Sequence, residues 1–247
     1  MERREYERLA AVEERGWWFR GLHANLIRAW QSRAPRTGDA ILLDAGCGTG
    51  GLLTRLAEAA PSARRYGLEF DPGAAETARD KSGATLIVGS VLAPPLAPRS
   101  CDAIFSADVL CHRGVEPAEA LAALAPCLKP GGMLLLNLPA YRWLFSGHDL
   151  AVDNVRRFGA GEVRALLRDA GFAGIRIAYW NSLLFPLMVA QRFIHRGAKS
   201  DVELLPPAVE RLFGAIVRSE LALAACGLRL PFGGSILATA VKPCPMP

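Results

Sequence analysis

A glycine-rich segment directly after a short apolar run is the feature that most limits how this chain can fold. Residues 40–43 are all apolar, and Asp44 then precedes Gly46, Gly48 and Gly50. A continuous apolar run of this length is typical of a strand buried on both faces of a parallel sheet. Glycines between such a strand and a helix allow a tight turn and let a ligand approach the backbone. The segment therefore predicts a nucleotide-binding turn at the carboxyl end of the first strand.

Strand and helix patterns alternate from this turn to about residue 180. Prolines and glycines punctuate apolar residues at helical spacing, which predicts helices between the strands. The expected strands are 40–43, 65–70, 86–88, 103–105, 133–138, 175–180 and 235–241. Such alternation favours a mostly parallel sheet that helices cover on both faces. We therefore expect an α/β, Rossmann-like doubly wound fold.

The composition excludes several classes of protein. Of the 247 residues, 51% are hydrophobic and 21% are charged, which permits a sizeable core and excludes intrinsic disorder. The six cysteines form no Cys-x-x-Cys pair and no zinc-ligand spacing, so we expect no metal and the reduced thiols of a cytoplasmic protein. No apolar run reaches the about 18 residues that span a membrane, and no secretory signal is expected. The formal net charge of +5 does not predict nucleic-acid binding.

Two segments fall outside the alternation. Residues 1–38 are expected to form an N-terminal helical leader, and residues 181–230 a helical cap inserted before the last strand. Both are candidates for a lid over a core made of residues 39–180 and of the final strand and tail, 231–247. The insert also contains an apolar run beside several cations. Peripheral contact with a membrane surface is one interpretation of that run, and a cap packed on the sheet is the favoured one.

The second expected strand ends at Glu69, and a carboxylate there can accept hydrogen bonds from both hydroxyls of a ribose. Each such charged hydrogen bond is worth about 1.5–3 kcal/mol. Gly46, Gly48 and Gly51 also fit the spacing of a dinucleotide site, so a nicotinamide-dependent oxidoreductase is an alternative. Asp44 favours a ligand with a cationic end, because a carboxylate near a pyrophosphate is repulsive.

Four segments between residues 40 and 140 together resemble the class I S-adenosylmethionine-dependent methyltransferases. These segments are 42–50, 66–71, 101–110 and 128–134. The chain also resembles a bacterial subgroup of these enzymes, in the Trp-Trp-Phe-Arg stretch at 17–20 and in residues 139–149, 156–158 and 231–235. The resemblance implies a seven-stranded sheet whose last strand is antiparallel, and S-adenosylmethionine as the cofactor.

The resemblance also assigns residues to the cofactor by position. The glycine turn would contact the methionine part through its backbone, Glu69 would hold the ribose, and Phe70 would flank the adenine. Arg20 would pair with the cofactor's carboxylate, although the tryptophans beside it could simply dock the leader on the sheet. The residues expected at the cofactor are Trp18, Arg20, Asp44, Gly46, Cys47, Gly48, Glu69, Phe70, Ser90, Val91 and Ala107.

Methyl transfer from a sulfonium is an in-line displacement, in which positioning of the reactants can supply about 7–11 kcal/mol of the barrier. A strong catalytic side chain is therefore optional. His148, after the fifth strand, is the first candidate for a general base, with Asp149 to orient it. The alternative is a surface histidine. His112, after the fourth strand, is the second candidate, although helix capping or packing is favoured for it.

Tyr141, Trp143, Arg157 and Glu220 are the candidate substrate-binding residues. The two aromatic residues would line the acceptor pocket or form core, and Arg157 would recognise an anion or lie at a solvated helix N-terminus. Glu220 is expected on the apolar face of an insert helix, where a buried or pocket role is plausible. The apolar insert predicts a small-molecule, lipid-like or saccharide acceptor. A nucleic-acid substrate is disfavoured, because no base-flipping signature follows the fourth strand. A protein acceptor and a non-catalytic nucleotide-binding module stay open as alternatives.

Overall fold

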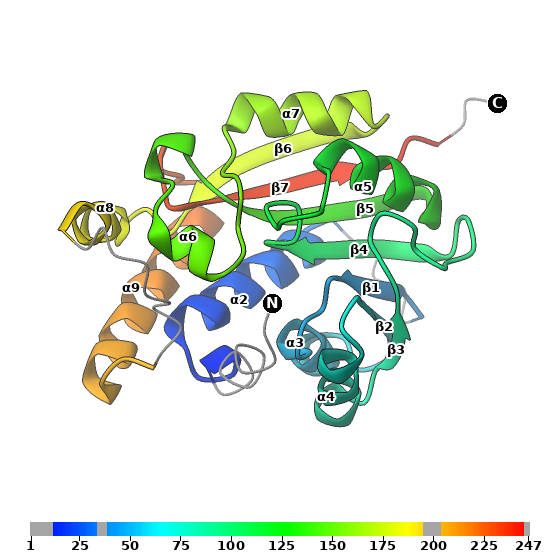
Figure 1. Ribbon diagram of the computed structural model, residues 1–247, viewed down its shortest axis with the longest axis horizontal. Helices are drawn as coiled ribbons and strands as arrows, with labels where there is room; N and C mark the ends of the chain where they lie inside the picture. The colour runs from blue at the N-terminus through cyan, green and yellow to red at the C-terminus, as the bar shows by residue number, and fades with distance from the viewer. Residues whose placement is uncertain (1–11, 34–38, 195–203, 245–247) are drawn as a thin grey trace.

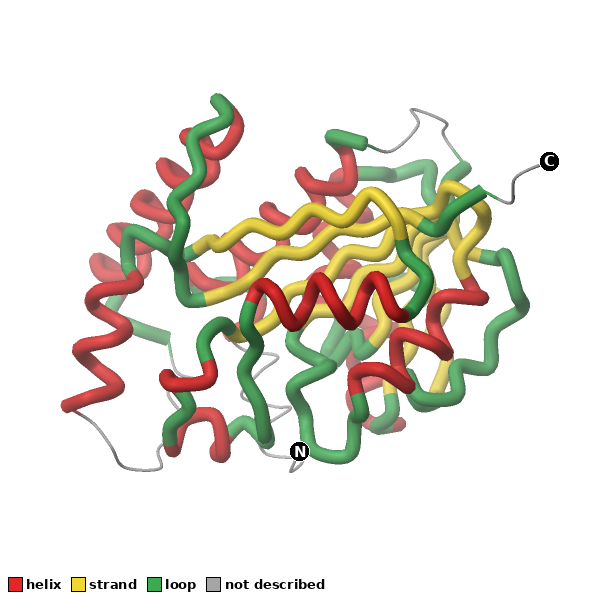
Figure 2. The backbone as a smooth tube through the Cα atoms, turned by 90° about the horizontal axis from the view of Figure 1, so that it is seen from above, coloured by secondary structure: helices red, strands yellow, loops and turns green. Residues whose placement is uncertain are grey.

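One seven-stranded sheet forms the centre of the protein (Figure 1). The computed structural model describes residues 12–33, 39–194 and 204–244. The strand order is β3-β2-β1-β4-β5-β7-β6, and β7 runs antiparallel to both of its neighbours while the other pairs are parallel. Helices lie on both sides of the sheet (Figure 2). The doubly wound α/β fold with an antiparallel last strand is therefore confirmed.

The strands follow the expected apolar runs, with one difference at the fifth. They are β1 (Ile41–Ala45), β2 (Arg64–Glu69), β3 (Thr85–Val88), β4 (Cys101–Ala107), β5 (Leu128–Pro139), β6 (Ala173–Trp180) and β7 (Ser235–Val241). The fifth strand begins at Leu128 rather than at Met133, because Leu128 already pairs with Cys101. The register then shifts before Met133 pairs with Ala103, and Gly131 lies within that irregularity with φ +79°.

The helices occupy the segments between the strands. They are α2 (Trp17–Gln31), α3 (Gly51–Ala59), α4 (Pro72–Ser82), α5 (Pro117–Leu124), α6 (Gly147–Ala151), α7 (Ala160–Asp169), α8 (Phe185–Ile194) and α9 (Pro207–Ala225), with short 3₁₀ turns at Ala125–Cys127 and Arg142–Leu144. Local chemistry sets the ends of α4. The Asp71 side chain accepts the Ala74 amide at 2.8 Å, and Gly83 ends the helix at φ +65°.

The core has two layers, one on each face of the sheet. Neighbouring residues of β1 point to opposite faces, so Leu42 and Leu43 belong to different layers. On the Leu43 side, α5 and α7 contribute residues such as Leu121 and Leu167. On the Leu42 side, the apolar residues of α2, α3 and α9 cover the sheet. This two-sided burial explains why the apolar run at β1 shows no alternation with polar residues.

The leader helix α2 and the insert helix α9 pack against each other beside the sheet (Figure 1). The rings of Trp17 and Phe213 meet edge to face at 5.4 Å. A Cβ at Gly21 would lie 2.6 Å from Cγ1 of Val217, so the absence of a side chain allows this close approach. Two segments far apart in the sequence therefore form one layer over the sheet.

The outer face of the insert exposes apolar side chains. Phe193 of α8, and Leu183 just before this helix, are each exposed to about half of their area. Within the described residues, no helix has both the length and the apolar character needed to cross a membrane. Peripheral membrane contact through the insert stays a prediction.

Glu210 of α9 caps the first turn of α2, because Gly16 at the N-cap offers no side chain. Its Oε2 accepts the Trp17 amide at 2.8 Å, and its Oε1 accepts the Leu205 amide at 3.0 Å. Glu210→Ala should lower the free energy of unfolding by about 0.5–2 kcal/mol, the usual cost of a lost cap. Urea unfolding measures this loss, and Glu210→Gln is the matched control because it keeps an acceptor oxygen. Equal stability of the alanine variant and the wild type would show that the contact between α2 and α9 does not depend on this cap.

Candidate functional site

A cavity of about 1320 Å³ opens where β1, β2 and β4 end. Its volume exceeds the about 300–1,000 Å³ that is typical of a site for one small ligand. One end is lined by the glycine turn after β1, and the other end by residues of α6 and α8. The leader closes one side through Trp17 and Trp18. The cavity therefore has room for two reactants side by side.

The glycine turn adopts a backbone that side chains would prevent. Gly46, Gly48 and Gly50 have φ values of +81°, +53° and +85°. A Cβ at Gly46 would also lie 2.3 Å from Cγ2 of Val109. The Gly46 amide donates to the Leu68 carbonyl oxygen at 2.8 Å, which fixes the turn against β2. The turn is consequently a preformed wall of the cavity with its backbone accessible to a ligand.

Glu69 lies at the end of β2 with its carboxylate at the cavity wall. One carboxylate oxygen accepts the Gly48 amide at 2.8 Å, and the other accepts the Asp71 amide at 3.0 Å. The side chain is only 6% exposed, so the two amides hold it in one position. Phe70 follows Glu69 and lines the cavity. Its side chain is 78% exposed, so the ring is accessible to a planar ligand.

Three carboxylates surround the glycine turn: Glu13, Asp44 and Glu69. Burial, followed by the negative charges of Glu13 and Glu69, raises the pKa of Asp44 well above its ordinary value. Glu13 accepts the Thr49 hydroxyl at 2.6 Å and pairs with Lys81 at 3.2 Å. This end of the cavity therefore attracts a cation and repels a phosphate. Sequence analysis missed Glu13, because nothing in the leader indicates that it folds back to the glycine turn.

Asp108, His112 and His148 also line the cavity. Asp108 follows β4 in a left-handed conformation, with φ +53°. Burial raises its pKa to about 7, against the lowering effects of the Asn137 amide and of Arg157. Burial also lowers the pKa of His112, so this imidazole is neutral at pH 7. Asp108 belongs to the segment 101–110 that resembles the methyltransferases, but no spacing within that segment predicts a role for it.

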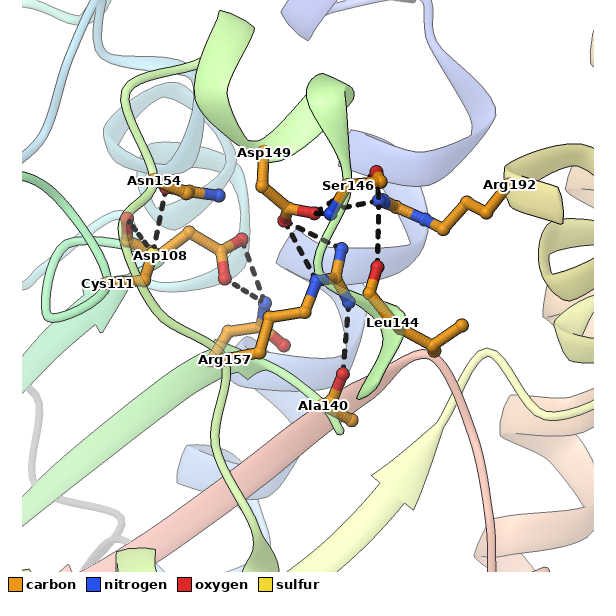
Figure 3. Close-up of polar contacts among 10 residues, drawn as sticks. Asp108, Cys111, Ala140, Leu144, Ser146, Asp149, Asn154, Arg157 and Arg192 are labelled. Atoms are coloured by element: carbon orange, nitrogen blue, oxygen red, sulfur yellow. Dashed lines mark hydrogen bonds and ion pairs between the residues drawn. The ribbon is translucent and has the colours of Figure 1, made fainter. Parts of the chain in front are cut away.

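The prediction that Asp149 orients His148 is wrong. The Asp149 carboxylate is completely buried and faces Arg157 and Arg192, each at 2.8 Å, while it also accepts the Ser146 amide at 2.9 Å (Figure 3). The charge and hydrogen bond of Arg157 and the charge of Arg192 outweigh the effect of burial, so the pKa of Asp149 lies below its ordinary value. Asp149 connects α6 to α8 and to the chain before α7, so its role is structural.

Arg157 is buried as well, and its charge is compensated by Asp149. Its guanidinium pairs with Asp149 and also donates to the Ala140 carbonyl oxygen at 3.0 Å. It borders the cavity, but its charge is already engaged. The interpretation of Arg157 as a residue at a solvated helix N-terminus is therefore wrong.

Three other predicted site residues do not line the cavity. Tyr141 stacks on Tyr179 at 5.3 Å and, with Trp143, belongs to an aromatic cluster on the outside of the insert. Glu220 accepts the amides of Ser182 and Leu183 at 2.8 and 3.1 Å, so it holds the turn after β6. Their predicted contacts with the substrate are not supported by these positions, because packing and turn formation use these side chains.

Arg20 also lies away from the cavity. It is exposed on the outer side of α2, next to Arg55 and Glu58. Trp17 and Trp18 line the cavity, whereas Arg20 borders a separate, smaller surface pocket. The predicted pairing of Arg20 with the cofactor's carboxylate is therefore corrected. The other residues predicted at the cofactor all line the cavity, namely Trp18, Asp44, Gly46, Cys47, Gly48, Glu69, Phe70, Ser90, Val91 and Ala107. In the part of the chain that the structure describes, no cluster of three or more metal-binding side chains occurs.

Comparison with known proteins agrees with this fold and site. A family described as "Methyltransferase domain" matches residues 43–136. The malonyl-[acyl-carrier protein] O-methyltransferase of Dechloromonas aromatica is 32% identical over 142 residues, which are 55% of this chain and 53% of the relative. The release factor glutamine methyltransferase of Mycolicibacterium smegmatis is 30% identical over 159 residues, covering 59% and 57%. The chain thus spans about half the length of the curated relatives it matches.

Solved structures show the same fold along more of the chain. A S-adenosylmethionine-dependent methyltransferase from Thermotoga maritima superposes with a TM-score of 0.62 at 20% identity, covering 97% of this chain and 95% of that one. Phosphoethanolamine N-methyltransferase 2 of Haemonchus contortus, in complex with S-adenosylmethionine, gives 0.59 at 18% identity, covering 89% and 53%. At these identities the likeness shows the fold alone.

The fold and the glycine turn define a Rossmann-like nucleotide-binding domain. Residues 43–136 match the methyltransferase-domain family, and the fold is similar to that of solved S-adenosylmethionine-dependent methyltransferases. S-adenosylmethionine fits the residues present, because the turn leaves no room for side chains and acidic groups surround it. Glu69 would hold the ribose of such a cofactor, and the acidic cluster would hold its cationic part.

Asp149→Asn should lower the free energy of unfolding by about 3–5 kcal/mol, because it leaves the buried Arg157 charge without its partner. Asp153→Asn is the matched control. It breaks the exposed pair with Arg113 and should cost about 1 kcal/mol or less. Denaturant unfolding of both variants measures the difference. If Asp149→Asn kept wild-type stability, Asp149 would not be the structural centre described above.

Glu69→Ala should weaken the binding of S-adenosylhomocysteine about 10- to 150-fold, the equivalent of one lost charged hydrogen bond. Titration calorimetry measures this affinity, and circular dichroism checks that the fold is kept. Glu76→Ala, an exposed glutamate of the neighbouring helix α4, is the control. Unchanged affinity of the Glu69 variant would remove the ribose assignment.

Proposed function

We propose that this protein transfers the methyl group of S-adenosylmethionine to a small, largely apolar molecule that carries a nucleophilic O–H or N–H group. The bound cofactor supplies an electrophilic methyl group on a positively charged sulfur. The observation that carries the proposal is one cavity that is lined both by the glycine turn with its acidic groups and by apolar side chains of α8 and the α9 region. Two reactants placed in the two ends would meet near Ala107 and Asp108, where β4 stops.

The acidic end favours a cationic cofactor over a nicotinamide dinucleotide. Glu13, Asp44 and Glu69 lie close enough for two of them to raise the pKa of the third. The pyrophosphate of a dinucleotide would add negative charge to this cluster, whereas the ammonium and sulfonium groups of S-adenosylmethionine would neutralise it. Intact glycine geometry also argues against a module that has lost its ligand, since Gly46 and Gly50 keep positive φ values.

The apolar side chains that line the cavity favour a hydrophobic acceptor. They are Leu184, Leu187 and Met188 from α8 and the turn before it, together with Leu205 and Phe213 from the α9 region. The charges of Arg157 and Arg192 at its border are paired with Asp149. Burial of an apolar substrate body against such side chains is worth about 25 cal/mol per Å². We therefore expect an acceptor whose apolar part lies along α8 and whose nucleophile points toward β4.

The protein's contribution to catalysis would be mainly positional. A cavity that holds both reactants in line would supply about 7–11 kcal/mol of the barrier through positioning. His148 and His112 line this cavity, so both remain candidates for contact with the acceptor. Without Asp149 to orient it, His148 would act through hydrogen bonding to the acceptor.

A labelling experiment tests the acceptor class. Protein is incubated with S-adenosylmethionine tritiated on its methyl group and with a heat-treated bacterial lysate, in which endogenous enzymes are inactive. We expect label in the butanol-extractable small molecules and none above background with Glu69→Ala. Label in acid-insoluble protein would contradict the proposed acceptor and indicate a protein substrate. Binding of S-adenosylmethionine with no transfer to any fraction would indicate a non-catalytic module.

A further inference from the structure

We propose that the Asp108 carboxylate takes the proton of the acceptor's nucleophile, and that Asn137 and Trp180 are the residues that position it. This inference rests on the proposed function and adds the group that completes its chemistry. Asp108 lies at the wall of the cavity directly after Ala107, where the two ends of the cavity meet. It is thus the carboxylate between the cofactor end and the acceptor end.

The backbone of Asp108 is fixed in its left-handed conformation. Its amide donates to the Asn137 carbonyl oxygen at 2.9 Å, and its own carbonyl oxygen accepts the Cys111 thiol at 3.1 Å. A non-glycine residue at φ +53° costs free energy, and the surrounding contacts must over-determine it. Such conformations occur often where a side chain has to be aimed at a reaction centre. Here the conformation fixes the direction in which the Asp108 side chain leaves the backbone.

A buried hydrogen-bond chain fixes the carboxylate itself. The Asn137 side-chain nitrogen donates to both oxygens of Asp108, at 3.0 and 3.1 Å. The Asn137 side-chain oxygen accepts the indole N–H of Trp180 at 2.7 Å. Because an indole N–H only donates, it forces the amide to present its NH₂ group to Asp108. Asn137 and Trp180 are 0% and 3% exposed, so this orientation has no competition from water.

The carboxylate keeps capacity for a proton. An ionised carboxylate offers about four acceptor positions, and the Asn137 amide uses two of them. Arg157, in the chain before α7, lowers the pKa of Asp108, and Asp149 of α6 raises it. Cys111 and His112 are titratable groups that follow Asp108 in the sequence. The balance of burial and these neighbours brings the pKa of Asp108 to about 7. A group with such a pKa is well matched to general-base catalysis near neutral pH.

The step balances without a further reactant. The acceptor's oxygen or nitrogen lone pair forms the new bond to the methyl carbon, while the carbon–sulfur bond breaks and leaves its electron pair on sulfur. Asp108 takes the proton that the acceptor loses, at a side-chain oxygen, and becomes neutral. It returns that proton to water when the products leave. Asn137 stabilises the ionised form before the step through its two contacts.

The titration of Asp108 is the first test, and it uses the protein without cofactor. A carboxyl group whose pKa rises from 3.8 to about 7 on folding binds its proton more tightly in the folded state. Its contribution to stability is therefore complete below about pH 4 and is lost as the pH rises to about 7. We expect the Tm of Asp108→Asn minus the Tm of the wild type to increase over this range. A difference that stays flat with pH would overturn the proposal.

Turnover is the second test, with the butanol-extractable fraction of the heat-treated lysate as acceptor. Asp108→Asn should bind S-adenosylhomocysteine as the wild type does but transfer label about 10²- to 10⁴-fold more slowly. Equal transfer by both proteins would overturn the role of Asp108 and leave the proposed function intact. Failure of the wild type to transfer label would instead overturn the proposed function, whatever the titration shows.

Trp180→Phe tests the positioning chain and covers the case in which Asp108→Asn does not fold. It removes the donor to Asn137, so the amide can turn its oxygen toward Asp108. We expect the acid limb of the pH–rate profile to move to higher pH and turnover to fall about tenfold. Trp30→Phe is the matched control, because Trp30 is a buried tryptophan that packs on Phe105 of β4 and takes no part in the hydrogen-bond chain from Trp180 to Asp108. The same pH–rate profile for both variants would contradict a positioning role.

Discussion

The hydrogen bond from the Gly48 amide to the Glu69 carboxylate joins the first two strands of the sheet at the edge of the cavity. The contact requires an open glycine turn after β1 and an acidic residue at the end of β2, and parallel pairing of these strands brings the two together. Asp44 and Glu13 add negative charge at the same place. A polar, acidic wall is thereby built before any ligand arrives, and it suits a cationic nucleoside.

The remainder of the molecule encloses this wall. The leader helix and the insert helices come from opposite ends of the chain, yet Glu210 and the packing of Trp17 on Phe213 hold them together. Asp149 fixes α8 over the cavity through Arg192 and fixes the chain before α7 through Arg157. Buried pairs of this kind give little net stability, but they are costly to break, so they define the geometry of a lid well. The acceptor end of the cavity therefore has a defined shape.

Local patterns predicted most of the fold, because burial on both faces of a strand and the chemistry of helix ends leave direct marks in the sequence. The glycine turn was predictable because its backbone geometry demands glycine, and Glu69 was predictable from its position at the end of the second strand. The functions of Asp149, Tyr141, Arg20 and Glu220 were not, because each depends on which distant side chain lies opposite. Glu13 and the chain from Trp180 to Asp108 likewise arise only from tertiary contacts.

A crystal structure of the protein with S-adenosylhomocysteine tests the central assignment most directly. We expect both ribose hydroxyls at the Glu69 carboxylate, the amino group near the acidic cluster, and the sulfur facing the space beside Ala107 and Asp108. A nucleoside bound outside the cavity, or inside it with the ribose away from Glu69, would contradict the assignment of this cavity to a cationic nucleoside cofactor.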